Sequence, residues 1–197
     1  MMPDNKDTNE ILRLYSSDLL ELQRHIVDMV KDQSDQEEVQ RYPEVQQLVT
    51  KIQDTVGQHF NELEQGLESL GGEKSSLLKQ AMGRVAETAM GMATKAEGSE
   101  KCSKVLRNNY VALDAAALGS LMLYATAAAF NNDRIGEISE RHFNELSSLA
   151  VEIREMIPEI VVKEFADQGY AVNSGVTEEV NRKVQQAWGQ GAAFSQK

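Results

Sequence analysis

Residues 123–150 read LYATAAAFNNDRIGEISERHFNELSSLA, and this stretch decides the fold. Its first part is rich in alanine and its middle, NND, is a turn signal. Its last part repeats apolar residues at spacings of three and four, which is typical of an amphipathic helix. We therefore predict helices at about 100–130 and 133–166, joined at 131–133 into an antiparallel hairpin.

Another helical hairpin is predicted nearer the N-terminus. Residues 8–32 carry one apolar stripe, a polar link follows, and Pro43 suits the entry to a helix at about 44–70, which stops at two glycines. The stripe of the first helix consists of Leu12, Tyr15, Leu19, Leu22, Ile26 and Met29. A weaker, methionine-rich helix is predicted at about 75–96, inside the long connection between the hairpins. No stretch alternates for long enough to predict a strand, so the fold class is all-α.

The last thirty residues differ from the rest. We predict one helical domain at 8–167 and a C-terminal extension at 168–197. In the extension, Thr177 can cap a short helix, with Glu178 and Glu179 in its first turn, and Trp188 would dock it. The final residues are expected to fray.

The composition excludes several classes of partner. The chain of 197 residues has 20 Lys and Arg against 31 Asp and Glu, and its net charge of −11 repels nucleic acids and anionic membranes. Residues 115–130 carry no charge, but they lack a basic flank, so we predict a buried helix and not a membrane span. The single cysteine, Cys102, and the polar start MMPDNKDTNE predict a cytoplasmic protein without a signal peptide.

The pentapeptide HFNEL occurs twice, at 59–63 and at 142–146. His59 and His142 both fall within the apolar stripes of their helices, so we predict that both are buried and approach each other. Glu62 and Glu145 lie three residues further on, at the stripe edges, within reach of the interior. A buried imidazole without a partner would cost about 1–3 kcal/mol, so each histidine should have one.

With these motifs the chain resembles the ferritin-like superfamily, and most closely its stress-associated YciE-like branch. The resemblance rests on HFNELEQGLESLGG at 59–72 and on the 123–150 stretch, and it covers about residues 10–165. It implies a ferritin-like four-helix bundle with two iron or manganese ions held between the helices by glutamates and Glu-x-x-His pairs. Carried over to this chain, it nominates four metal ligands in the order His-x-x-Glu: His59, Glu62, His142 and Glu145.

The other two helices depart from that pattern. On the first helix, Glu21 points almost opposite the apolar stripe, whereas Asp18 and His25 flank its boundary and complete the candidate ligand set. Three arrangements stay open: a functional di-metal site, a degraded or single-metal site, and a metal-free polar core in which Tyr110 and Tyr124 hydrogen-bond the imidazoles. The alanine-rich helix has no carboxylate where one is needed, because its line reads Ala117, Ser120, Leu121 and Tyr124.

Two functions follow from these alternatives. The first is a ferritin-like protein of stress-associated type with a degenerate or partial iron/manganese site; as an enzyme it would be a di-metal oxidase or a peroxide-handling protein. The second is a metal-free structural scaffold whose small-residue helix at 100–130 makes close contacts in a dimer. In both cases we expect a homodimer and neither a nucleic-acid nor a membrane partner.

Overall fold

The computed structural model describes residues 7–71, 101–173 and 175–194, and within these ranges the protein is all-helical, with no β-strand. The four long helices that the sequence predicts are confirmed to within two residues at each end. The crossover helix predicted at 75–96 lies outside the described residues. The elements are α1 (Thr8–Val30), η1 (Gln33–Asp35), α2 (Glu37–Gln40), α3 (Pro43–Ser69), α6 (Cys102–Ala129), α7 (Asp133–Asp167) and α8 (Val176–Phe194).

Local signals set the helix ends. The Asp7 carboxylate accepts a hydrogen bond from the backbone amide two residues on and caps α1. Pro43 begins α3, where its missing amide hydrogen has no helical partner to lose. Asn132 caps α7 through the amide three residues on, and Asn131 before it adopts φ +55°, the left-handed conformation that reverses the chain. The predicted hairpin turn is therefore confirmed.

Two segments differ from the prediction. The link before α3 contains η1 and α2, and it buries Val39 and Tyr42. Two apolar residues in a polar run give no periodic signal, which is why these short turns were not predicted. At the other end, α8 begins at Val176, so Thr177 lies inside its first turn, and the helix continues to Phe194 where a frayed end was expected.

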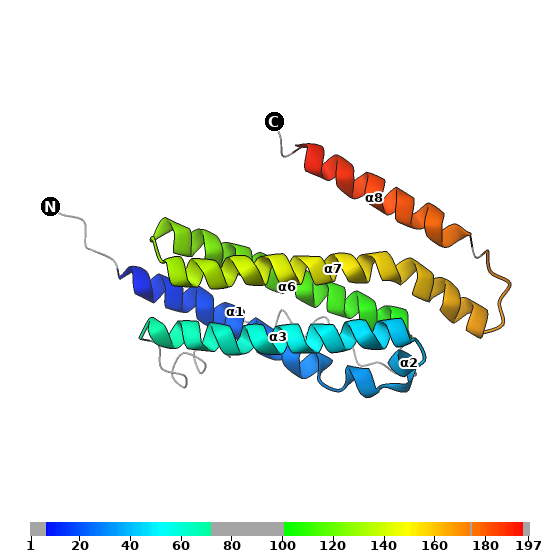
Figure 1. Ribbon diagram of the computed structural model, residues 1–197, viewed down its shortest axis with the longest axis horizontal. Coiled ribbons are helices and arrows are strands. Elements are labelled where there is room, and N and C mark those ends of the chain that lie inside the picture. Colours follow the sequence, from blue (N-terminus) through cyan, green and yellow to red (C-terminus); the bar gives the residue numbers. More distant parts are fainter. Residues whose placement is uncertain (1–6, 72–100, 174, 195–197) are drawn as a thin grey trace.

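The four long helices lie side by side, and α8 lies to one side along α7 (Figure 1). α1 packs against α3 and α6, and α7 packs against α6 and α3; we call these four helices the helical body. α8 is held to α7 by two contacts: the Arg154 guanidinium lies 4.7 Å from the ring centre of Trp188, and the Asn181 amide donates to the carbonyl of Glu155. None of the described side chains of α8 is fully buried.

α3 and α7 are antiparallel, and polar contacts follow their whole length. The start of α3 meets the end of α7, where Glu44 pairs with Lys163 at 2.6 Å. Further along, Lys51 pairs with Glu152. The end of α3 meets the start of α7, where Glu62 contacts the side chain of Arg141.

The apolar core of the helical body is divided into two clusters. The turn-end cluster lies where α6 turns into α7, and it contains Leu12, Leu19, Leu20, Leu63, Leu67, Leu70, Leu123, Ala127 and Ile135. The link-end cluster lies near α2 and takes the other half of each long helix, from Ile26 on α1, up to Val56 on α3, up to Ala117 on α6 and from Leu146 on α7. Each helix therefore crosses a boundary between two apolar regions.

Among the described residues, α6 is the one helix long and apolar enough to cross a membrane by length and composition alone. In the structure it packs against α1 and α7. Its buried face includes the polar side chains of Asn109 and Ser120, and Asn109 donates to Gln33 at 2.8 Å. Only 33% of its most apolar window is buried, and Leu118 and Met122 on its other face are exposed, so the helix is less buried than predicted.

Candidate functional site

A polar layer separates the two apolar clusters. The buried polar side chains in the boundary between the clusters include Gln23 of α1, His59 of α3, Ser120 of α6 and His142 of α7. All four side chains have no exposed surface. We call these four residues the polar layer. A buried polar side chain is unfavourable unless it is hydrogen-bonded, so one from each long helix at the same level marks a site that needs an explanation.

The two histidines of the layer are bonded to the glutamates of the opposite repeat. His59 Nε2 lies 2.6 Å from Glu145 Oε2, and His142 Nε2 lies 2.9 Å from Glu62 Oε2. Each HFNEL copy thus supplies a histidine to the interior and a glutamate to the other copy's histidine. The predictions that both histidines are buried and that they approach each other are confirmed.

The crossed pairing follows from the antiparallel packing of α3 and α7. Moving three residues forward along α3 corresponds to moving three residues back along α7. When His59 faces Glu145, the same register therefore brings Glu62 opposite His142. A His-x-x-Glu motif written once on each helix is enough to make two reciprocal pairs.

The imidazole rings stack on each other. Their centroids lie 3.8 Å apart and their planes are 14° from parallel. Burial and the neighbouring His59 together lower the pKa of His142 from 6.5 to about 4, although the Glu62 carboxylate acts in the opposite direction. Burial also lowers the pKa of His59, against the opposing effect of Glu145. Both rings are therefore neutral near pH 7.

The two glutamates differ in their surroundings. Glu62 accepts hydrogen bonds from Gln58 and His142 and also contacts Arg141. Burial alone would raise the pKa of Glu62, but these three donors together lower it to about 2. Glu145 is more exposed, with 45% of its side-chain surface accessible against 25% for Glu62. Of the two His–Glu pairs, the one that contains Glu62 therefore has more hydrogen-bond partners and less exposure to solvent.

The structure leaves two of the predicted ligands outside this centre. Asp18 and His25 are exposed on α1, and His25 Nε2 lies 3.9 Å from a carboxylate oxygen of Glu21. Glu21 itself is buried, although its position on the helix is far from the apolar stripe. The structure thus brings together His59, Glu62, His142 and Glu145, and it places Asp18 and His25 at the surface.

The prediction that tyrosines hydrogen-bond the imidazoles is wrong. In each ring Nε2 faces a glutamate, whereas the buried Nδ1 atom has no hydrogen-bond partner. Tyr110 and Tyr124 are partly buried, and neither donates to His59 or His142. The glutamates bind the rings instead. Each lies three residues after the histidine of its own helix, and the antiparallel packing places its carboxylate level with the ring of the other helix.

Gln23 is the layer residue that sequence reasoning missed. The predicted stripe of α1 passed through Leu22 and Met29, but the structure buries Gln23 completely and leaves Met29 exposed. The sequence does contain a second helical line, displaced by one residue from part of the predicted stripe. Its residues are all buried: Leu12, Ser16, Leu19, Gln23, Ile26 and Val30. A glutamine in such a line indicates a polar contact in the interior.

The donor set does not fit a di-metal centre. Such a centre takes carboxylates from all four helices, but α1 and α6 present the neutral amide of Gln23 and the hydroxyl of Ser120 to the layer. Imidazole lone pairs lie in the ring plane, and two nearly parallel planes do not meet within bonding distance of both rings, so His59 and His142 cannot share one ion. In the part of the chain that the structure describes, no group of three or more His, Cys, Asp or Glu side chains is arranged to hold a metal.

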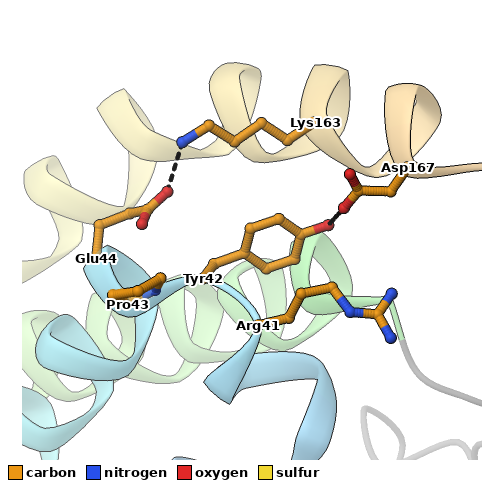
Figure 2. Close-up of a pocket in the computed structure, with 6 residues that line it drawn as sticks. All are labelled: Arg41, Tyr42, Pro43, Glu44, Lys163 and Asp167. Atoms are coloured by element: carbon orange, nitrogen blue, oxygen red, sulfur yellow. Dashed lines mark hydrogen bonds and ion pairs between the residues drawn. The ribbon is translucent and has the colours of Figure 1, made fainter.

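A surface pocket at the other end of α3 also brings charged groups together. Figure 2 shows Lys163 and Asp167 of α7 facing Glu44 and Tyr42 across it. The Tyr42 hydroxyl donates to Asp167 at 2.8 Å, and burial together with this bond raises the pKa of Tyr42. Lys163 is paired with Glu44. These four groups already satisfy one another, so their contacts join the start of α3 to the end of α7.

Comparison with known proteins gives one match. A family model described as "Domain of unknown function (DUF892)" matches residues 9–166, which span the helical body. No curated protein and no solved structure matches the chain.

Proposed function

The chain belongs to this family, and we propose that it is a ferritin-like four-helix bundle of stress-associated type that works as a metal-free scaffold. The superfamily and its stress-associated branch rest on the resemblance at 59–72 and 123–150. The helical body supports the bundle, because four long helices pack around one interior with an antiparallel hairpin at α6–α7. In this proposal the chain keeps the helix connectivity of the superfamily, and the residues between its helices have a structural role.

The single observation that carries the proposal is the composition of the polar layer. Two of its four residues, Gln23 and Ser120, are uncharged and poor ligands for iron or manganese, which prefer carboxylates and imidazoles. The two imidazoles are already bonded through Nε2 to Glu145 and Glu62. Reciprocal His–Glu pairs fix the register of α3 on α7, a use of buried polar groups that is well attested in helical assemblies.

Metal content tests this proposal. The protein is purified without chelator, its iron, manganese and zinc are measured by elemental analysis, and its absorption spectrum is followed after ferrous iron is added in air. We expect much less than one metal ion per chain and no ferroxidase-like absorption change. Stoichiometric iron or manganese that disappears in both His59→Ala and His142→Ala, with the melting temperature unchanged, would overturn the scaffold proposal. His25→Ala is the matched control, because this histidine lies at the surface.

A second candidate is a pair of half-sites, one ion at each His–Glu pair. The N···O separations of 2.6 and 2.9 Å are close to those of two donors on the same ion, since metal–ligand bonds of about 2.0–2.2 Å at right angles give about 3 Å. Manganese titration followed by electron paramagnetic resonance tests this candidate. Binding that Glu62→Ala and Glu145→Ala each reduce by half would favour the half-sites, and absence of bound manganese at millimolar concentration would exclude them.

The scaffold proposal includes a homodimer built on the outer face of α6. Leu118 and Met122 are each 55% exposed there, and Leu121 is 40% exposed. Residues 115–132 carry no charge in a chain of net charge −11. Two copies of such a chain repel each other over most of their surfaces, so an uncharged apolar face is where they can approach.

The dimer is tested by placing a charge on that face. We expect the wild type to sediment as a dimer and Leu121→Glu to sediment as a monomer. Val151→Glu is the matched control, because Val151 is also 40% exposed but belongs to α7. A wild type that remains monomeric at high micromolar concentration, or a control that dissociates as readily as Leu121→Glu, contradicts the assignment of this face.

A further inference from the structure

The polar layer contains hydrogen-bonding atoms that no protein group satisfies. They are the amide nitrogen and oxygen of Gln23 and the Nδ1 atoms of His59 and His142. All three side chains are completely buried. Most buried polar atoms in proteins have a partner, so several unsatisfied atoms in one place indicate a bound molecule.

These atoms come from three helices but gather at one level. The Arg24 guanidinium lies 5.5 Å from the centre of the Phe60 ring, so the preceding residues, Gln23 and His59, lie on facing turns of α1 and α3. The ring of His59 stacks on that of His142 across the α3–α7 contact. The unsatisfied atoms therefore lie at one level of the helical body, between the two apolar clusters.

The hydrogen positions decide which ligand the region takes. Each Nε2 faces a glutamate that is an acceptor when ionised, so a neutral ring carries its hydrogen on Nε2 and leaves a bare lone pair on Nδ1. A ligand must therefore donate hydrogen bonds to both rings. It must also accept from the Gln23 nitrogen and donate to the Gln23 oxygen.

Few ligands meet these requirements. An anion would be buried without a counter-charge, because none of the four layer residues is cationic. One metal ion cannot lie in both ring planes, because these are almost parallel. An apolar molecule would leave all four atoms unsatisfied. Each water molecule has two donors and two acceptors, so two neighbouring waters supply the three hydrogens that the Gln23 oxygen and the two Nδ1 atoms need.

We propose that the polar layer is a binding site for internal water, held by Nδ1 of His59, Nδ1 of His142 and the side-chain amide of Gln23. The water completes the hydrogen bonding of the layer and connects α1 to the stacked histidines of α3 and α7. Ser120 takes no part, because its hydroxyl donates to the carbonyl of Ala116 in its own helix at 2.9 Å. This inference goes beyond the scaffold proposal, which concerns metal and assembly.

Water-oxygen magnetic relaxation dispersion on the full chain detects water that stays bound far longer than surface water. We expect such a signal in the wild type and in Ser120→Ala, the matched control within the layer. In Gln23→Met, which keeps the length of the side chain and removes its hydrogen bonding, we expect the signal to fall. A wild type without long-lived water overturns the proposal, as does a signal that survives Gln23→Met unchanged.

The melting temperature gives an independent reading. In a dry layer the Gln23 amide is unsatisfied, and replacing it by methionine should raise the melting temperature. In a hydrated layer the change removes a satisfied group and strands the water, so the melting temperature should fall. A rise overturns the water site and leaves the metal-free scaffold intact, whereas stoichiometric metal in the wild type overturns the scaffold, so the two failures are distinguishable.

Discussion

Glu145 Oε2 lies 2.6 Å from His59 Nε2, so the hydrogen bonding of the first HFNEL copy is completed by the second. The reciprocal bond between Glu62 and His142 makes the repeat a matched pair across α3 and α7. Sliding one helix by a single turn would break both bonds at once and leave two buried imidazoles without these partners. The repeat therefore selects one register among those that the apolar stripes allow.

Removing the two glutamates should have unequal effects. Glu62→Ala takes a partner from His142, Arg141 and Gln58, and we expect it to lower the free energy of unfolding by about 1–3 kcal/mol. Glu145→Ala removes a more exposed side chain and opens a path for water to His59, so its effect should stay below about 1 kcal/mol. Urea unfolding of both variants measures the difference, and equal losses would contradict it.

Stability should fall as the pH decreases below about 6.5. The pKa of His142 is 6.5 in the unfolded chain and about 4 in the folded protein, because burial disfavours the charged ring. Between these values the unfolded state binds a proton that the folded state does not, which favours unfolding by on the order of 3 kcal/mol at the lower end. The pKa of Glu62, which folding lowers from 4.5 to about 2, continues the loss at lower pH.

Urea unfolding at a series of pH values measures this dependence. The free energy of unfolding should be constant above about pH 7 and should decline from about 6.5 toward 4. His25→Ala should leave the decline unchanged, because this side chain lies at the surface. A free energy that does not change between neutral pH and pH 5 would show that the folded protein holds these rings as readily charged as neutral.

Two glycines of α3 should respond in opposite ways to alanine. A Cβ at Gly66 would lie 3.1 Å from Cδ1 of Ile135, which is completely buried, so Gly66→Ala should lower the free energy of unfolding by about 1 kcal/mol or more. A Cβ at Gly57 meets nothing within 4 Å, so Gly57→Ala should raise it by about 0.5–1 kcal/mol through helix propensity. Thermal unfolding of both variants provides the comparison. Stabilisation by both substitutions would mean that Ile135 can move aside to make room for a Cβ atom at Gly66.

Glu164 should matter for the start of α6. Its two oxygens accept hydrogen bonds from the backbone amide and the hydroxyl of Ser103, at 2.9 and 2.6 Å, and the side chain is buried. Glu164→Ala removes this cap from another helix, and we expect a loss of about 1–2 kcal/mol together with faster hydrogen exchange of the Ser103 amide. Ser103→Ala keeps the backbone bond and should leave that amide protected. Equal exchange in the two variants would argue against a capping role.

The long helices could be predicted because their apolar residues recur at helical spacing and their ends carry recognisable signals. Pro43 and the left-handed Asn131 are examples. The burial of His59 and His142 was equally predictable, since each occupies a core position in a stripe. These features depend on residues close together in the chain, and the physics that sets them is local.

The partners of the histidines could not be predicted in the same way. They depend on the direction and register of α3 against α7, which are fixed by packing between distant segments. The tyrosine prediction failed for this reason, and Gln23 was missed because two overlapping lines on α1 both look apolar. Gln23 and Ser120 provide no carboxylate ligand to the layer. That Gln23 and Ser120 lie level with the two histidines can be seen only once the four helices are placed together.

We expect the polar layer to limit how far cooperative unfolding extends along the molecule. Apolar contacts pass continuously within the turn-end cluster and within the link-end cluster, but between them the same four helices are joined by polar side chains. A helix can then open at one end while its other end remains folded, because the loss of one cluster does not strip the other. Native-state hydrogen exchange should accordingly resolve two groups of amides, one with Leu67 and Ile135 and one with Val49 and Ile153. We therefore expect the midpoint of each long helix to be the boundary between two cooperatively unfolding units.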